Sequence, residues 1–159
     1  MRESINGAWL LGIVMVFMVI FIAYISISIN YSNAYRMKTQ MVTAIEQYEG
    51  FNEKTLARLE AIRSGYNYNN TAPCNVGESG EAVGVLDGVV STSNPPTGVY
   101  NYCITREKRP AQDGEEDKYY YTVVVFFDFN LPVLGDIFKF KVSGETNVIY
   151  YPNDTKFTR

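Results

Sequence analysis

An uncharged apolar run near the N-terminus constrains this chain more than any other feature. It covers Ala8–Ile29, reads AWLLGIVMVFMVIFIAYISISI, and contains no Asp, Glu, Lys or Arg. At about 1.5 Å per helical residue, the run extends roughly 33 Å, enough to cross a hydrocarbon core of about 30 Å. Trp9 and Tyr24 lie near opposite ends, which is typical of aromatic residues at membrane interfaces. The run therefore predicts a retained single-pass anchor in the lipid bilayer, beginning with Ala8, Trp9, Leu10 and Leu11 and ending with Ile29.

Different sequence features point to opposite orientations of this anchor. Arg2 precedes the run, whereas Arg36 and Lys38 follow it, and this count slightly favours a cytoplasmic C-terminal domain. A short N-terminal tail, a cysteine pair that could form a disulfide and an Asn-, Thr- and aromatic-rich composition favour the opposite side. We expect a cell-membrane protein whose C-terminal domain is extracytoplasmic.

The helical pattern continues beyond the anchor without a proline. Apolar residues recur at spacings of three and four, which predicts an amphipathic extension of the same helix. The stripe consists of Ala34, Met37, Met41, Ile45 and Tyr48. It is interpreted as a core-facing cover for a sheet, and it is also a candidate surface for packing with partner helices. Asn52 is then expected to cap a second short helix that Gly65 closes.

Tyr66–Gly80 is turn-rich and polar and is expected to be a loop or linker, and after it the pattern becomes strand-like. Four segments are expected to form strands or hairpins: Glu81–Ser91 with a turn at Asp87-Gly88, Val99–Thr105, Lys118–Phe129, and Ile137–Tyr151 with a bulge at Gly144. The expected fold is α+β, in which a transmembrane helix extends into an amphipathic helix packed on a small antiparallel sheet. Its parts are the tail and anchor (1–30), the helical extension and short helix (31–65), and the β domain (66–159).

The two cysteines, Cys74 and Cys103, have two open interpretations: a disulfide or a pair of free buried thiols. The 28 residues between them would make a closed loop, and such a disulfide contributes roughly 3–4 kcal/mol in the chain-entropy model. A disulfide would also indicate an oxidising compartment.

Several classes of function are disfavoured by what the sequence lacks. The 159 residues include no histidine, the commonest general base and zinc ligand, and no nucleotide-binding or nucleophile motif. The net charge of −3 is spread over mixed signs, without a basic patch for nucleic acid. We therefore expect no enzyme, cofactor, metal or nucleic-acid partner. Tyr66, Tyr68 and the Tyr119–Tyr121 run are candidates for a carbohydrate- or protein-binding surface, or for sheet packing.

The final third of the chain carries a family resemblance. Residues 123–146 read VVVFFDFNLPVLGDIFKFKVSGET, a strand that leads into a proline-containing apolar stretch and a last alternating strand. With the long N-terminal helix, this arrangement resembles the TadE/TadG-like pseudopilins, which have a type IV pilin-like architecture. The segment Asn6-Gly7-Ala8 is similar to a prepilin peptidase site, and cleavage after Gly7 would leave Ala8 as the mature N-terminus. Gly12 stands at the fifth mature position, where such pilins usually carry glutamate.

The resemblance implies a membrane-anchored structural subunit of a pilus or secretion-type assembly. Its N-terminal helix would pack with other pilin-like or membrane subunits. The alternative, from a different class, is a monomeric membrane-anchored extracytoplasmic sensor or ligand-binding domain.

Overall fold

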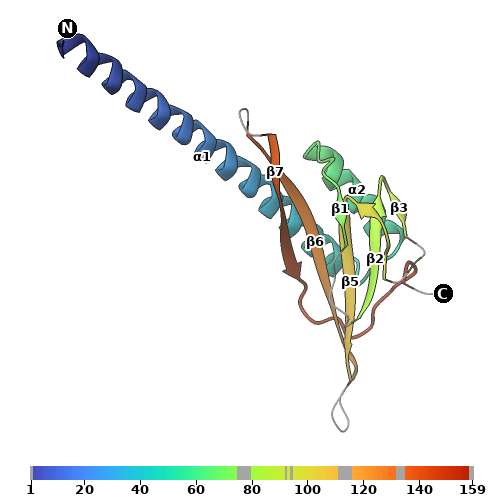
Figure 1. Cartoon of the computed structure of the whole chain (residues 1–159). Helices are drawn as coiled ribbons and strands as arrows, with labels where there is room; N and C mark the ends of the chain where they lie inside the picture. The colour runs from blue at the N-terminus through green and yellow to red at the C-terminus, as the bar shows by residue number, and fades with distance from the viewer. Residues whose placement is uncertain are drawn as a thin grey trace.

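One continuous helix, α1 (Arg2–Gln47), runs from the N-terminus through the apolar run and into the folded domain (Figure 1). The computed structural model describes residues 2–74, 80–91, 93, 95–110, 116–131 and 135–157, but not the side chains of residues 2–8 and 128–139. Figure 1 shows the upstream half of α1 projecting alone and the downstream half lying against the sheet. The expected uninterrupted extension of the anchor is confirmed, because no proline or glycine breaks the ladder between Ile29 and Gln47.

The chain reverses direction in a tight corner between the two helices. Glu49 (φ 53°) and Gly50 (φ 131°) both adopt positive φ here. Asn52 then caps α2 (Glu53–Gly65) as predicted, and its side-chain oxygen accepts hydrogen bonds from the N–H groups of Lys54 and Thr55 at 3.0 and 3.1 Å. Gly65 was expected just beyond the end of this helix. It is instead the last helical residue, and Tyr66 is the C-cap.

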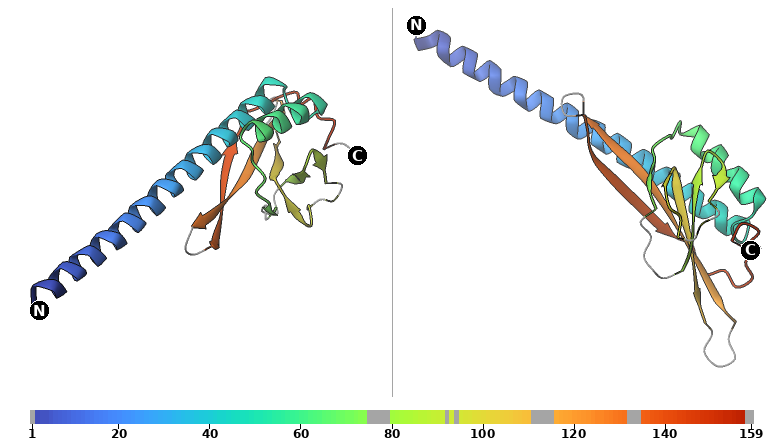
Figure 2. Two further views of the ribbon diagram at one scale, coloured as in Figure 1. Left: turned by 90° about the horizontal axis from the view of Figure 1, so that it is seen from above. Right: turned by 45° about the vertical axis from the view of Figure 1, so that its right-hand side comes forward.

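The sheet has five strands in the order β3-β2-β5-β6-β7, and every neighbouring pair is antiparallel. Its strands are β2 (Glu81–Leu86), β3 (Val89–Val90), β5 (Tyr102–Arg109), β6 (Lys118–Leu131) and β7 (Gly135–Glu145). A separate two-stranded ladder joins β1 (Ala72–Pro73) to β4 (Val99–Tyr100). The two helices form one layer and the sheet the other (Figure 2). The expected α+β class, with helices packed on antiparallel strands, is confirmed.

Two features of β4 and β5 differ from the sequence prediction. The predicted strand Val99–Thr105 is interrupted at Asn101, so Tyr100 packs on the face of Cys103 instead of sharing a face with Tyr102. β5 continues to Arg109, beyond the predicted strand end at Thr105, because Arg106–Arg109 pair with Lys118–Tyr121 of β6.

The C-terminal end of the sheet also differs. The strand expected to reach Tyr151 ends at Glu145, and beyond it the structure has an isolated bridge between Ile149 and Tyr119. The register shift lies between Phe129 and Asn130 and not at Gly144, which pairs regularly with Val123. A Cβ at Gly144 would overlap the end of the Lys38 side chain as placed here.

The sheet is covered on both faces around β6. Alternate residues of β6 meet the helices in the main core, which includes Met37, Met41, Leu59, Val123 and Val125. The intervening residues Val124 and Phe126 join a smaller cluster on the opposite face. The continuous apolar run of β6 therefore reflects burial on both sides.

Candidate functional site

The upstream half of α1 is an apolar surface that the domain leaves uncovered. Its large side chains are exposed from Trp9 (73%) through Phe17 (66%) to Ile29 (55%). The most apolar window of the helix has a mean hydropathy of 2.9, and none of it is buried. By length and composition, this helix can cross a membrane once.

The downstream half of the same helix is buried in the chain's own core. Met37, Met41 and Ile45 are completely buried, Ala34 nearly so, and Tyr48 is half-buried. All of these except Tyr48 pack with α2 and the inner face of the sheet. The candidate packing stripe is thus occupied within the domain, and it offers no free surface to a partner helix. Packing between subunits, if it occurs, falls to the upstream half.

The two halves meet without a flexible link. Tyr31, two residues beyond the predicted span, lies edge-on against Phe127 of β6, with ring centroids 6.0 Å apart. Ala34 already belongs to the core. Because the helix is continuous across this junction, no loop separates the domain from the predicted span.

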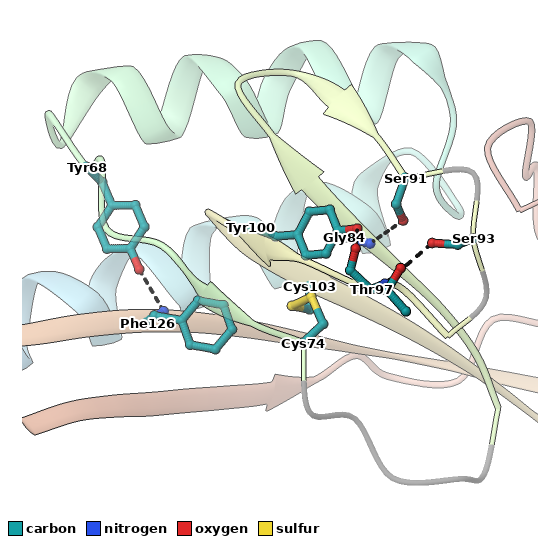
Figure 3. Close-up of a disulfide and its surroundings, with 9 residues drawn as sticks. All are labelled: Tyr68, Cys74, Gly84, Ser91, Ser93, Thr97, Tyr100, Cys103 and Phe126. Carbon is teal, nitrogen blue, oxygen red and sulfur yellow. Dashed lines mark hydrogen bonds between the residues drawn. A yellow bond between two sulfur atoms is a disulfide. The ribbon is translucent and has the colours of Figure 1, made fainter.

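The cysteine pair forms a disulfide on the outer face of the sheet. Cys74 and Cys103 have Cα atoms 5.8 Å apart, within the range that disulfides require. Figure 3 shows the bond beside Tyr100 and Phe126. Phe126 belongs to the small apolar cluster on this face of the sheet, and Tyr100 packs against that cluster. It ties the segment after β1 to the central strand β5.

Two close contacts fix the surroundings of the disulfide (Figure 3). The Phe126 N–H donates to the Tyr68 hydroxyl at 2.6 Å. Gly84 lies under the Tyr100 ring, and a Cβ at this position would overlap the ring carbons. Gly84 therefore permits the close approach of β4 to β2.

A C-terminal clasp, defined as Asn153–Lys156, fastens the tail to the corner between α1 and α2. Asp154 is the centre of this clasp, with a side chain only 4% exposed. It accepts hydrogen bonds from the Phe51 N–H (2.6 Å), from Arg106 (2.5 Å) and from the Tyr121 hydroxyl (2.6 Å). The Asn153 N–H also donates to the Glu49 carbonyl at 2.7 Å.

Electrostatics within the clasp are balanced by pairing. Burial lowers the pKa of Arg106, but the hydrogen bonds and charges of Asp154 and Glu81 outweigh it, so that the pKa is raised overall. Burial is also the main cause that raises the pKa of Tyr121, followed by its hydrogen bond to Asp154. Both groups keep their ordinary protonation state at neutral pH.

A second buried tyrosine connects the sheet to α2. The Tyr102 hydroxyl donates to Glu60 at 2.9 Å, and Arg63 pairs with the same carboxylate at 2.9 Å. Burial, then the charge of Glu60, raises the pKa of Tyr102 well above its usual value. Sequence reasoning missed the contacts of Glu60 with Tyr102 and of Asp154 with Phe51, Arg106 and Tyr121, because these partners lie 33 to 103 residues apart in the chain.

The described residues show structural pairing and no assembled chemical centre. Among them, no group of three or more His, Cys, Asp or Glu side chains could hold a metal ion. Gly7 and Ala8 lie in the backbone of the first turns of α1, and cleavage between them stays a prediction. The stretch 132–134, on which the family resemblance partly rests, lies outside the described residues.

Comparisons with protein-family models, with curated proteins and with solved structures found no match.

Proposed function

We propose that this chain is a membrane-anchored structural subunit of pilin-like architecture, belonging to a pilus or secretion-type assembly. The observation that carries the proposal is the division of α1 into an exposed apolar half and a half buried in the domain. A helix built in this way can pack against other membrane helices while it holds its domain rigidly. The resemblance of the C-terminal strands to TadE/TadG-like pseudopilins supports the same function.

The proposed location of the domain is extracytoplasmic. Its support is the Cys74–Cys103 disulfide, because disulfides persist in oxidising compartments and are rare in the cytosol. Protease shaving of intact cells, with thiol labelling before and after reduction, tests this placement. Protection of the domain together with two thiols that react without reductant would overturn it. Intact-mass analysis in the same cells tests for a mature chain that starts at Ala8.

Cysteine scanning of the exposed half of α1 tests assembly. Single cysteines are introduced from Leu10 to Ile22 in the full-length protein, and oxidative cross-linking is measured in its native membranes. If the helices pack, the positions at which a cysteine cross-links two subunits should recur about every 3.6 residues along α1. The native disulfide does not interfere, because Cys103 is completely buried and Cys74 nearly so. Lys54→Cys, exposed on α2, is the control and should cross-link weakly.

The alternative function, a monomeric anchored sensor or ligand-binding domain, is favoured by one observation. A cleft of about 370 Å³ lies where α1 meets the segment after α2. Absence of cross-links at every scanned position, in membranes where the Lys54→Cys control is folded, would reject the structural-subunit proposal in favour of this alternative.

A further inference from the structure

A cleft opens at the junction between the predicted span and the domain. One wall is α1, which contributes Asn30 and Asn33 directly after the predicted end of the span at Ile29. The other wall is the segment Tyr66–Asn70, which follows α2, and the apolar lining includes Met37 and Phe127. Its volume of about 370 Å³ lies at the lower end of small-molecule sites, which span roughly 300–1,000 Å³.

The wall formed by Tyr66–Asn70 is held in place by hydrogen bonds to residues that do not line the cleft. Arg63 donates to the Tyr68 carbonyl (3.3 Å) and to the Asn69 side-chain oxygen (3.2 Å). The Asn101 amide donates to the Asn70 carbonyl at 3.3 Å, and Asn101 is itself buried. The Tyr68 hydroxyl accepts from the Phe126 N–H (Figure 3). The wall is therefore preformed, which lowers the entropic cost of binding a ligand.

The chemistry of the lining is polar but uncharged. Of the ten described residues that line it, five are asparagines, two are tyrosines, and none is Asp, Glu, Lys or Arg. A carboxamide offers both a donor and an acceptor, which matches a hydroxyl group that also does both. Aromatic rings supply flat apolar surfaces with polar edges. Among the described lining residues, a phosphate or carboxylate would find no cation, and a cationic ligand would find no carboxylate.

We propose that this cleft binds a neutral carbohydrate of one or two sugar units at the membrane surface. The hydroxyl groups hydrogen-bond to the asparagine amides, and the apolar face of a sugar ring packs against the tyrosine and phenylalanine rings. The same chemistry suits the headgroup of a neutral glycolipid and a free or cell-wall saccharide. The site does not depend on whether α1 assembles with other helices.

The test uses full-length protein in nanodiscs. Saturation-transfer NMR is measured with a panel of neutral disaccharides over phosphatidylcholine nanodiscs. In the second arm, the nanodiscs carry a neutral diglycosyl lipid. Binding is measured there as slower hydrogen exchange of the Tyr66–Asn70 backbone amides. Binding in both arms identifies a saccharide site open to solvent, and binding in the lipid arm alone identifies the glycolipid headgroup.

The double variant Asn30→Ala/Asn33→Ala removes two amides from the α1 wall. Both side chains are exposed, and alanine favours the helix, so the fold should persist. Loss of one uncharged hydrogen bond weakens binding by roughly two- to tenfold, and the double variant, which loses two, should bind roughly four- to hundredfold more weakly. Gln40→Ala/Gln47→Ala is the matched control, since it removes two exposed amides from the same helix outside the cleft.

Three results would overturn the proposal. The first is no binding of the disaccharide panel or the glycolipid by the wild-type protein. The second is unchanged binding by the Asn30→Ala/Asn33→Ala variant. The third is equal protection of the cleft by anionic phosphatidylglycerol nanodiscs, which would identify a general lipid-surface contact.

Discussion

The carboxylate of Asp154 connects three parts of the domain that are distant in sequence. Its donors come from the corner before α2 (Phe51), from β5 (Arg106) and from β6 (Tyr121). The Phe157 ring lies on the same corner, with the Arg106 guanidinium 4.9 Å from its centroid. At the residue scale, the C-terminal segment is thus held by one buried charge together with backbone hydrogen bonds such as that from Asn153 to Glu49, and not by a strand.

Replacement of Asp154 by alanine should lower the free energy of unfolding by about 3 kcal/mol, because the variant leaves a half-buried guanidinium without its main partner and a backbone N–H unpaired. Chemical denaturation of the full-length protein in micelles, followed by circular dichroism, measures the change. Lys156→Ala is the control, since it removes only the surface pair with Glu53 and should cost within about 1 kcal/mol. Equal effects of the two variants would contradict the assigned role.

Buried Tyr102 and Tyr121 make the stability of the domain sensitive to alkaline pH. The folded state raises the pKa of both phenols, mainly by burial. Below about pH 10, where both states keep these protons, their contribution to stability is fully present. Above about pH 10 the unfolded chain releases the protons and the folded chain retains them, so stability falls by about 1.4 kcal/mol per pH unit for each tyrosine.

The Tyr102→Phe variant should therefore lose stability less steeply than the wild type above pH 10. Its stability near neutral pH is lower, because Glu60 loses a hydrogen-bond donor. Denaturation midpoints measured at several pH values between 8 and 12 give the two slopes. Identical slopes would mean that Tyr102 does not resist ionisation in the folded state.

At the scale of elements, the parts that were predictable are those whose signals are local. The continuity of α1, the Asn52 cap and the turn at Asp87-Gly88 each depend on a few neighbouring residues. The extension of β5 through Arg109 was missed because its residues are charged and carry no apolar alternation. The residues after Glu145 were wrongly extended as a strand, since Val148 and Tyr150 do alternate, while the long-range Asp154 contacts that redirect the chain leave no local pattern.

The two halves of α1 should respond differently to the same substitution. Met41 is completely buried, whereas Met18 is 54% exposed in the apolar half. Met41→Ala should lower the free energy of unfolding by about 2–5 kcal/mol, through lost burial and a cavity. Met18→Ala should leave the stability of the domain unchanged in micelles, as measured by the same denaturation assay. A large effect of Met18→Ala would mean that the apolar half contributes to the domain's own core.

This difference changes how assembly can be tested by mutation. A charge at Met41, such as Met41→Glu, would place a carboxylate in the main core and disrupt the fold itself. Impaired assembly of that variant would therefore carry no information about helix packing. Substitutions in the exposed span are the informative ones.

The disulfide stabilises the outer face of the sheet, where the apolar cluster is small. Reduction of the bond, or the double variant Cys74→Ala/Cys103→Ala, should cost about 2–4 kcal/mol of stability. Thermal unfolding with and without reductant measures the effect. The double variant serves as the control, because a reductant should not change its midpoint. A wild-type midpoint unaffected by reductant would show that the bond contributes nothing to stability.

At the scale of the whole molecule, the predicted membrane span and the sheet domain are joined by one continuous helix. The chain enters the core at Ala34, five residues after the predicted end of the span, without leaving α1. The pattern of apolar residues indicated this continuity, and the Tyr31–Phe127 contact adds a connection that only the folded sheet creates. Any packing that orients the span must therefore also orient the domain.

A proline at the junction should uncouple the orientation of the domain from the orientation of the predicted span. Ser32→Pro removes the hydrogen bond from residue 32 to the Ser28 carbonyl and kinks or breaks the helix, at a helical cost of about 3 kcal/mol or more. The core begins at Ala34, so the domain should stay folded while its orientation becomes variable.

Spin labels at Val19→Cys and Lys54→Cys, both exposed positions, should give a narrow distance distribution in the parent protein and in Ser32→Ala. The distribution should broaden in Ser32→Pro, and the periodic cross-linking of the span should persist if the helices pack independently of the domain. A distribution as narrow in Ser32→Pro as in Ser32→Ala would mean that sheet contacts such as Tyr31–Phe127, and not the continuity of α1, hold the domain in place.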